Sequence, residues 1–127
     1  MAQVYKVADG FDHAVFENSS CAFGVFDGVH IGHRYLLECA QASAAQCGGQ
    51  SIALTFDIDP DEIFHPERLR KLLSNERRLQ MLADSGVDAV VVLPFTREFA
   101  SLSPCDFLEK TFNGHAPAHL HLSLIHI

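Results

Sequence analysis

The segment Cys21–His33, with the sequence CAFGVFDGVHIGH, constrains the fold more than any other part of this chain. Its apolar start is typical of the end of a buried strand, and Gly24 and Gly28 then interrupt regular structure. From about Ile31 the pattern becomes helical. A strand, a glycine-containing turn and a helix N-terminus, in this order, form the place where α/β proteins bind phosphate groups.

Two histidines stand at the predicted helix start. His30 and His33 are three residues apart, so they share a face if both lie on the first turn. Gly32 between them has no side chain to hold a phosphate away from the backbone. The spacing alone leaves three interpretations open: a metal pair, an incidental surface pair, or donors to a phosphate. Asp27 likewise either hydrogen-bonds the backbone of the turn or lies near a ligand and its magnesium.

The composition narrows the class of protein. A length of 127 residues fits one domain, and 48% hydrophobic with 20% charged residues is an ordinary globular balance. The net charge of −7 disfavours nucleic acid as a partner, and no apolar run approaches the length of a membrane span. The cysteines form no Cys-x-x-Cys pair, and the N-terminus does not resemble a secretory signal. We therefore expect a cytoplasmic protein that acts on small molecules; the composition does not determine an oligomeric state.

Strands and helices alternate along the rest of the chain. The predicted strands are Ser19–Val25, Ser51–Phe56 and Asp88–Leu93, and the predicted helices are Gly32–Cys47, Asn75–Ser85 and a last helix that starts at Pro104 after the N-cap Ser103. The last of these strands has no polar alternation, as expected of a strand buried on both faces. This order predicts a doubly wound α/β domain with a parallel sheet and right-handed crossovers.

Four other segments give weaker signals. Val4–Val7 and His13–Phe16 read as short extended segments joined by a turn, and Pro94–Leu102 reads as a loop. The tail Asn113–Ile127 is rich in histidine and continues no helical or strand pattern that we recognise. With no companion cysteine or carboxylate, its histidines are a weak candidate for a metal site, and we predict no metal ligands in this chain.

Ligands of such sheets bind beyond the carboxyl ends of the strands. Three loops are expected to meet there: Gly24–His33, Asp57–Arg68 and Pro94–Leu102. Their convergence would place the two histidines around one crevice with Phe56, Pro60 and Phe95. Phe56, Pro60 and Phe64 have two interpretations, as anchors of their loop or as an aromatic platform for a flat ring. The carboxylates around them lack the spacing of a calcium loop.

Four stretches together resemble the adenylyltransferase module of bacterial riboflavin kinase/FAD synthetase. They are GVFDGVHIGH (Gly24–His33), TFDIDP (Thr55–Pro60), GVDAVVVLPF (Gly86–Phe95) and FASLSPCDF (Phe99–Phe107). The first contains the His-x-Gly-His signature of nucleotidyltransferases in general, and the others point to flavin. The resemblance implies a Rossmann-like nucleotidyltransferase fold. It also implies FMN adenylyltransferase activity, in which ATP, with Mg²⁺ on its phosphates, adenylates FMN to give FAD and pyrophosphate.

The resemblance also implies roles for residues. His30 and His33 would contact the phosphates and stabilise the transition state. The nucleotide pocket would be formed by Gly24, Phe26, Asp27, Gly28 and Gly32. The flavin side would be formed by Phe56, Pro60 and Phe64. Relative to a common family form, Val25 stands in place of Asn, and Ile58-Asp59-Pro60 in place of Pro-His-Pro.

Members of this family continue past the position of Phe112 into further strands, usually followed by a riboflavin kinase domain. We therefore expect residues 1–112 to be the N-terminal portion of an FMN adenylyltransferase domain with its C-terminal part missing, and 113–127 to be a divergent, non-native tail. The strand Asp88–Leu93 would then lie at an exposed edge, and the chain would show little or no turnover. The alternatives are another His-x-Gly-His enzyme, of cytidylyltransferase or pantetheine-phosphate adenylyltransferase type, and a non-catalytic nucleotide- or flavin-binding module.

Overall fold

A five-stranded parallel sheet forms the centre of the molecule. The computed structural model describes residues 2–7, 12–24, 26, 31–57, 75–94, 96–112, 114–115 and 117–122. The strands among these residues are β1 (Gln3–Lys6), β2 (Ser19–Phe23), β3 (Gln50–Phe56), β4 (Ala89–Leu93) and β5 (His119–Leu122). Their order is β1-β4-β3-β2-β5, and all neighbours are parallel. The predicted parallel sheet is confirmed.

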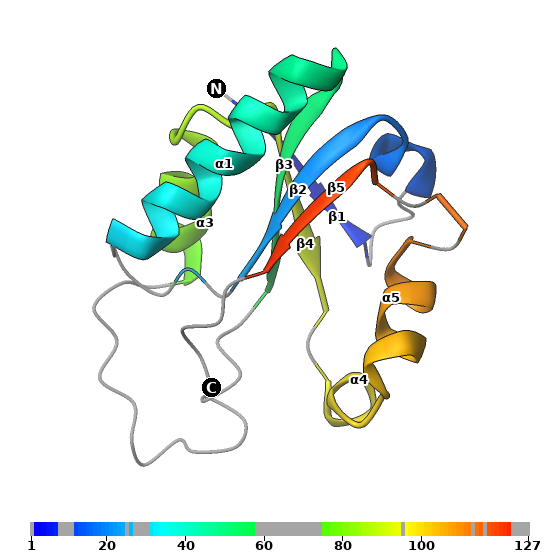
Figure 1. Ribbon diagram of the computed structural model, residues 1–127. Coiled ribbons are helices and arrows are strands. Elements are labelled where there is room, and N and C mark those ends of the chain that lie inside the picture. The colour runs from blue at the N-terminus through cyan, green and yellow to red at the C-terminus, as the bar shows by residue number, and fades with distance from the viewer. Residues whose placement is uncertain are drawn as a thin grey trace.

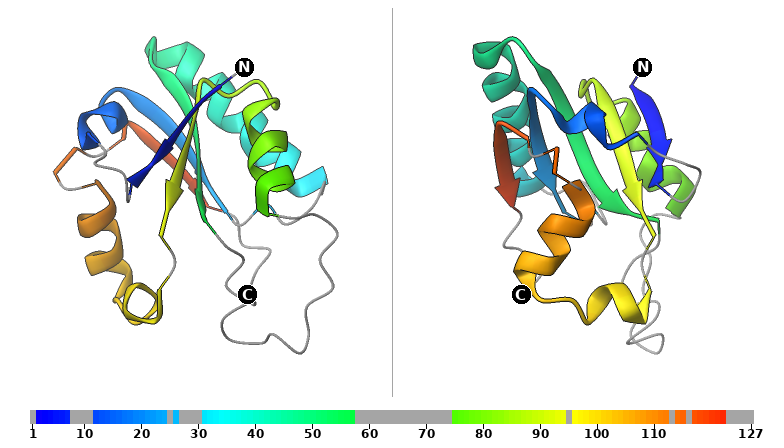
Figure 2. Two further views of the ribbon diagram at one scale, coloured as in Figure 1. Left: turned by 180° about the vertical axis from the view of Figure 1, so that it is seen from behind. Right: turned by 90° about the vertical axis from the view of Figure 1, so that its right-hand side faces the viewer.

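Helices cover both faces of this sheet. On one face lie α1 (Ile31–Cys47) and α3 (Asn75–Ala83), and on the other lies α5 (Pro104–Phe112), as Figures 1 and 2 show. A short helix, α4 (Arg97–Ala100), precedes α5. The doubly wound α/β class is thereby confirmed. Among the described residues, no helix has both the length and the apolar character needed to cross a membrane.

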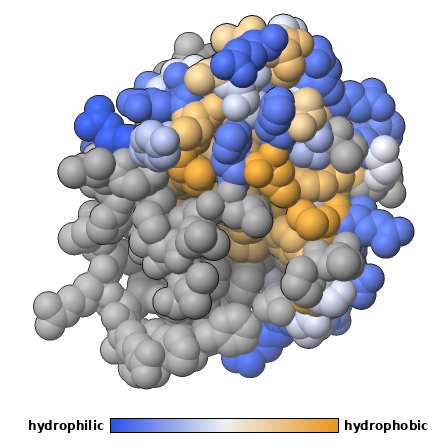
Figure 3. All heavy atoms as spheres, in the orientation of Figure 1, coloured by the Kyte–Doolittle hydropathy of each residue, from blue (hydrophilic) through white to orange (hydrophobic). Residues whose placement is uncertain are grey.

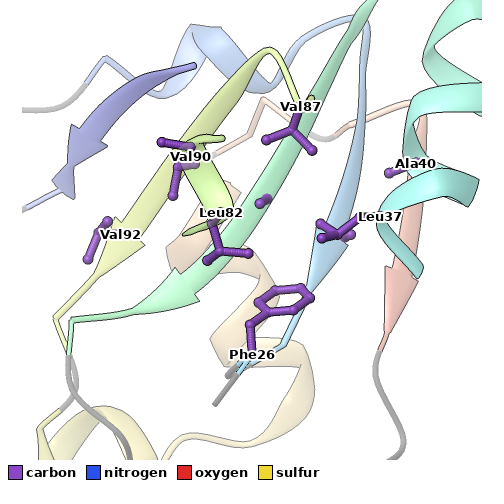
Figure 4. Packing of buried hydrophobic residues seen from close by; sticks show 10 residues of the cluster. Phe26, Leu37, Ala40, Leu82, Val87, Val90 and Val92 are labelled. Carbon is purple, nitrogen blue, oxygen red and sulfur yellow. The ribbon is translucent and has the colours of Figure 1, made fainter. Parts of the chain in front are cut away.

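Each face of the sheet has its own apolar core. The core under α1 and α3, drawn in Figure 4, includes Phe26, Leu37, Ala40, Leu82, Val87, Val90 and Val92. The core under α5 includes Phe16, Cys21, Ile52, Leu54, Phe56, Ala89, Val91, Leu93 and Phe112. Alternate residues of β4 thus belong to opposite cores, because successive side chains of a strand point to opposite faces. The uninterrupted apolar run of this strand reflects burial on both faces, as predicted.

The helix ends follow the expected signals. Gly48, at φ +69°, ends α1, and Gly86, at φ +102°, follows the last turn of α3. The hydroxyl of Ser103 accepts a hydrogen bond from the Asp106 N–H at 3.2 Å, which confirms its role as the N-cap of α5. One close approach was not expected: a Cβ at Gly49 would overlap the carbonyl oxygen of Asn18, so this position requires glycine.

His13–Phe16 is not an extended segment, as the sequence suggested, but the short 3₁₀ helix η2. Asp12 caps it by accepting a hydrogen bond from the Ala14 N–H at 3.0 Å. The ring of Phe16 is fully buried and packs edge-on against Phe112, with 4.8 Å between ring centroids. Burial of this ring against α5, a contact distant in sequence, decides the conformation. The predicted loop Pro94–Leu102 is also partly helical, since it contains α4.

The expectation that residues 113–127 form no element is wrong for His119–Leu122, which is strand β5. It pairs with β2 in parallel register, and the Ala118 N–H donates to the Ser19 carbonyl at 2.8 Å. Its alternating histidine and leucine residues suit an edge strand with one face on the core, against which Leu120 packs. In the orientation of Figure 3, apolar side chains gather in a band between α1 and α5, where this edge reaches the surface.

The strand predicted to lie at an exposed edge does not lie there. β4 is flanked by β3 on one side and by β1 on the other, with Gln3 opposite Ala89 in the register. The N-terminal segment therefore covers the edge that the sequence suggested would be open. Within the described part of the chain, the outer strands are β1 and β5.

Candidate functional site

The carboxyl ends of β2, β3 and β4 meet at one edge of the sheet. Just beyond β2, the Gly24 N–H donates to the Leu54 carbonyl of β3 at 3.1 Å. Just beyond β3, the Asp57 N–H donates to the Leu93 carbonyl of β4 at 2.9 Å. The three connections predicted to converge therefore start side by side. The helix that follows β3 is α3, on one face of the sheet, and the long helix that follows the neighbouring strand β4 is α5, on the other face. In α/β sheets, ligands bind where the connections of adjacent strands go to opposite faces.

The turn after β2 is held by a buried aromatic ring. Phe26 has a left-handed backbone, with φ of 55°, and its side chain is only 1% exposed. Figure 4 shows the ring directed toward Leu37 of α1 and Leu82 of α3. A left-handed conformation costs a non-glycine residue about 1–2 kcal/mol, and such strain persists where the surrounding structure imposes it. The predicted nucleotide residues Gly24 and Phe26 are thus both buried at the start of the strand-to-helix connection.

The predicted catalytic pair is only partly described. His30 lies outside the described residues, as do Asp27 and Gly28. Gly32 and His33 belong to the first turn of α1, of which the structure describes the backbone. This helix of 17 residues begins at Ile31, close after the end of β2. The first N–H groups of an α-helix have no partner within the helix, and together with the positive end of the helix dipole they favour an anion.

Phe56, predicted on the flavin side, belongs to an aromatic trio. Its ring meets Phe23 of β2 edge-on at 5.6 Å between centroids, and Phe107 of α5 at 6.4 Å. Phe23 and Phe107 are 5.4 Å apart. The side chain of Phe56 is 7% exposed, so this packing supports its interpretation as an anchor for the chain that leaves β3. The other flavin-side predictions, Pro60 and Phe64, lie outside the described residues.

Sequence reasoning missed a buried cation beside this edge. Arg78 of α3 is 2% exposed, and its guanidinium donates to the Thr55 hydroxyl at 2.8 Å and to the Phe56 carbonyl at 2.7 Å. Arginine remains protonated in proteins, so a full positive charge is buried at the end of β3. The sequence did contain a signal for this burial. Arg78 precedes Leu82 by four residues, so it lies on the same helix face as a residue of the buried apolar stripe.

Three other reactive side chains have defined surroundings. Burial raises the pKa of the Cys21 thiol to about 11, which keeps it protonated and unreactive. His115 Nδ1 is 2.9 Å from a Glu17 carboxylate oxygen, and His121 Nε2 is 3.3 Å from the Ser43 hydroxyl. No three of the His, Cys, Asp and Glu side chains that the structure describes are grouped so as to hold a metal ion.

Comparison with known proteins assigns the family. The sequence matches the FAD synthetase family over residues 12–122, which includes β5. The bifunctional riboflavin kinase/FMN adenylyltransferase of Listeria monocytogenes is 37% identical over 95 residues, covering 73% of this chain and 30% of that protein. The protein of the same name from Pseudomonas fluorescens is 33% identical over 107 residues, covering 82% of this chain and 34% of that protein. The chain thus spans about a third of the length of the curated relatives it matches.

A solved structure shares the fold. A crystal structure described as a macrolide-efflux protein from Streptococcus pneumoniae superposes with a TM-score of 0.67 at 26% sequence identity. The superposition covers 82% of this chain and 36% of that one. The sequence match, the relatives and the α/β architecture agree, and this chain belongs to the FAD synthetase family.

Proposed function

We propose that this chain carries the adenylyl-transfer site of an FMN adenylyltransferase. The reaction joins FMN and ATP to give FAD and pyrophosphate. The observation that carries the proposal is the position of Gly24–His33: in a member of the FAD synthetase family, this segment connects the interior strand β2 to the N-terminus of α1. A glycine-containing strand-to-helix connection of this kind suits a nucleotide phosphate.

In the proposed reaction, a phosphate oxygen of FMN attacks the α-phosphorus of ATP. A new oxygen–phosphorus bond forms, the bond from the α-phosphorus to the bridging oxygen breaks, and pyrophosphate leaves. Negative charge builds on the transferred and departing phosphates, so the protein needs oriented donors rather than a nucleophile. His30, His33 and the first amides of α1 would supply these donors. Magnesium would enter with ATP, held by its phosphates.

The remaining residues would position the two substrates. Gly24, Asp27, Gly28 and Gly32 would let the backbone approach the nucleotide, because three of them have no side chain and the fourth is short. Phe26, buried beneath the connection, would hold it in shape. On the flavin side, Pro60 and Phe64 would contact the isoalloxazine ring, while Phe56 would anchor the strand end behind them.

The test is FAD formation, followed by chromatography, with FMN, ATP and MgCl₂. It uses this chain and a version extended with the C-terminal segments of the Listeria relative. We expect His30→Ala to lower FAD formation by the extended chain at least ~100-fold, the usual cost of removing one transition-state donor. His119→Ala, an exposed histidine on β5, is the matched control and should leave the rate unchanged.

Two results would contradict the proposal in different ways. If the extended chain binds FMN and ATP yet releases no pyrophosphate, the domain is a binding module. If it adenylates 4′-phosphopantetheine or transfers CMP instead, it is a different nucleotidyltransferase. Equal loss of activity in His30→Ala and His119→Ala would assign the effect to stability rather than to a site.

A further inference from the structure

We propose that Arg78 is a positioning residue of the ligand site, acting through Thr55 and Phe56. This inference rests on the proposed function and adds a residue to it. Arg78 is on α3, yet its guanidinium lies at the carboxyl end of β3, where the chain turns toward the site. The side chain is 2% exposed and forms two short hydrogen bonds there, so its geometry is fixed.

The position of these bonds follows from the ladder of the sheet. Carbonyl groups two residues apart along a strand point to the same side. The Leu54 carbonyl accepts from Gly24 at the end of β2, so the Phe56 carbonyl also points toward β2. By that point β2 has ended, and the chain has turned at Phe26 with a left-handed backbone. Arg78 supplies a donor to the Phe56 carbonyl at the place where β2 leaves the sheet.

Arginine suits this task better than any other cation. Its planar fork can donate to the Thr55 hydroxyl and the Phe56 carbonyl at the same time, which fixes the direction of both groups. Lysine would place a single charged nitrogen there. Thr55, fully buried, begins the TFDIDP stretch that the sequence associates with flavin, and its hydroxyl has a defined partner in Arg78.

The bonds of Arg78 also matter for the ligand site. Both α3 and α1 lie on the same face of the sheet, and the N-terminus of α1 is the expected phosphate site. By holding the end of β3, Arg78 fixes the point from which the connection to α3 starts on this face.

The experiment compares Arg78→Met, Arg78→Lys and Thr55→Val with the wild-type chain. Arg77→Met is the matched control, because it removes an exposed arginine from the adjacent position of α3. Amide hydrogen exchange is measured at Asp57, which follows Phe56, at Gly24, whose N–H donates to the Leu54 carbonyl, and at Ser51 at the far end of β3. Dissociation constants are measured for FMN by fluorescence quenching and for Mg-ATP by calorimetry.

We expect Arg78→Met to speed exchange at Asp57 and Gly24 and to raise both dissociation constants about tenfold, as loss of a charged hydrogen bond predicts. Exchange at Ser51, whose N–H donates to Asp88 at 2.8 Å, should not change, since local opening does not reach it. Arg78→Lys keeps the charge but cannot donate to both groups in the same geometry, so its dissociation constants should fall between those of the wild type and those of Arg78→Met. Thr55→Val should weaken FMN binding less than Arg78→Met does.

Three results would overturn the inference. Faster exchange along all of β3, including Ser51, would assign Arg78 to global stability. Unchanged dissociation constants in Arg78→Met, with the wild type binding normally, would remove its role in ligand binding and leave the proposed function intact. If neither the wild-type chain nor its extended version binds FMN or Mg-ATP, the proposed function fails, and the ligand role of Arg78 fails with it. Should Arg78→Met not fold, Arg78→Lys and Thr55→Val carry the same comparison.

Discussion

Replacement of Phe56 by alanine should lower the free energy of unfolding by about 4–5 kcal/mol. Truncation of a buried phenylalanine costs about 3–5 kcal/mol through lost burial and the cavity that remains. Phe56 is 7% exposed, so almost the whole ring is buried and nearly the full cost of truncation applies. The edge-on contacts with Phe23 and Phe107 contribute about 0.5–1.5 kcal/mol each, which puts the expected value in the upper part of the range.

The measurement is urea-induced unfolding, followed by far-ultraviolet circular dichroism and supported by thermal scans. For a domain of this size each 1 kcal/mol corresponds to about 4 °C in Tm, so a decrease of about 16–20 °C is expected. Leu108→Ala is the control, because Leu108 follows Phe107 on α5 but is 38% exposed. It should change the free energy of unfolding by less than about 1 kcal/mol.

A loss no larger than that of Leu108→Ala would refute the packing argument. FMN binding by Phe56→Leu, which keeps most of the buried apolar area, separates the two interpretations of this residue. Retained FMN affinity indicates an anchor. A large loss of affinity at nearly unchanged stability would instead indicate that the ring itself contacts the flavin.

Three further predictions concern single residues. Ser103→Ala should destabilise the protein by about 1 kcal/mol in urea unfolding, because the Asp106 N–H loses its cap; no change would mean that this cap contributes nothing. Phe26→Gly should be more stable than Phe26→Ala by about 1 kcal/mol, since both lose the ring but only alanine keeps the left-handed strain; the reverse order would contradict the φ of 55°. Burial raises the pKa of Cys21 from its ordinary value of 9.0 to about 11, so the unfolded chain releases this proton more easily than the folded one. The resulting contribution to the free energy of unfolding is fully present below pH 9 and is progressively lost as the pH rises toward about 11. Cys21→Ala should flatten that decline in unfolding curves measured from pH 8 to 11, and an unaltered decline would show that another group causes it.

Much of the fold was predictable because its signals are local. The β2–α1–β3 and β3–α3–β4 units follow from apolar runs, helix periodicity and the glycines at positions 48 and 86, each of which acts within a few residues. Ser103 as an N-cap is a signal of the same kind. The glycine-containing connection after β2 could also be placed from sequence, because it lies between two strongly patterned elements.

What sequence reasoning missed depends on contacts between distant segments. β5 is a strand because it pairs with β2, almost 100 residues earlier. The extended segment expected at Val4–Val7 is present as β1, but its place beside β4 was not predicted. The 3₁₀ helix at His13–Phe16 forms because its phenylalanine is buried against α5. No pattern within any of these three segments specifies its partner.

For the candidate site the division is similar. Local periodicity and motifs are enough to predict the doubly wound class, the strand-to-helix connection that carries the His-x-Gly-His stretch, and the family. They do not predict that Phe56 packs into an aromatic trio or that Arg78 reaches the end of β3, which the folded structure shows. Both contacts form between side chains of separate elements, which local sequence patterns do not specify. Because these side chains are buried, the ring must pack against other side chains and the charge must find hydrogen-bond partners within the protein.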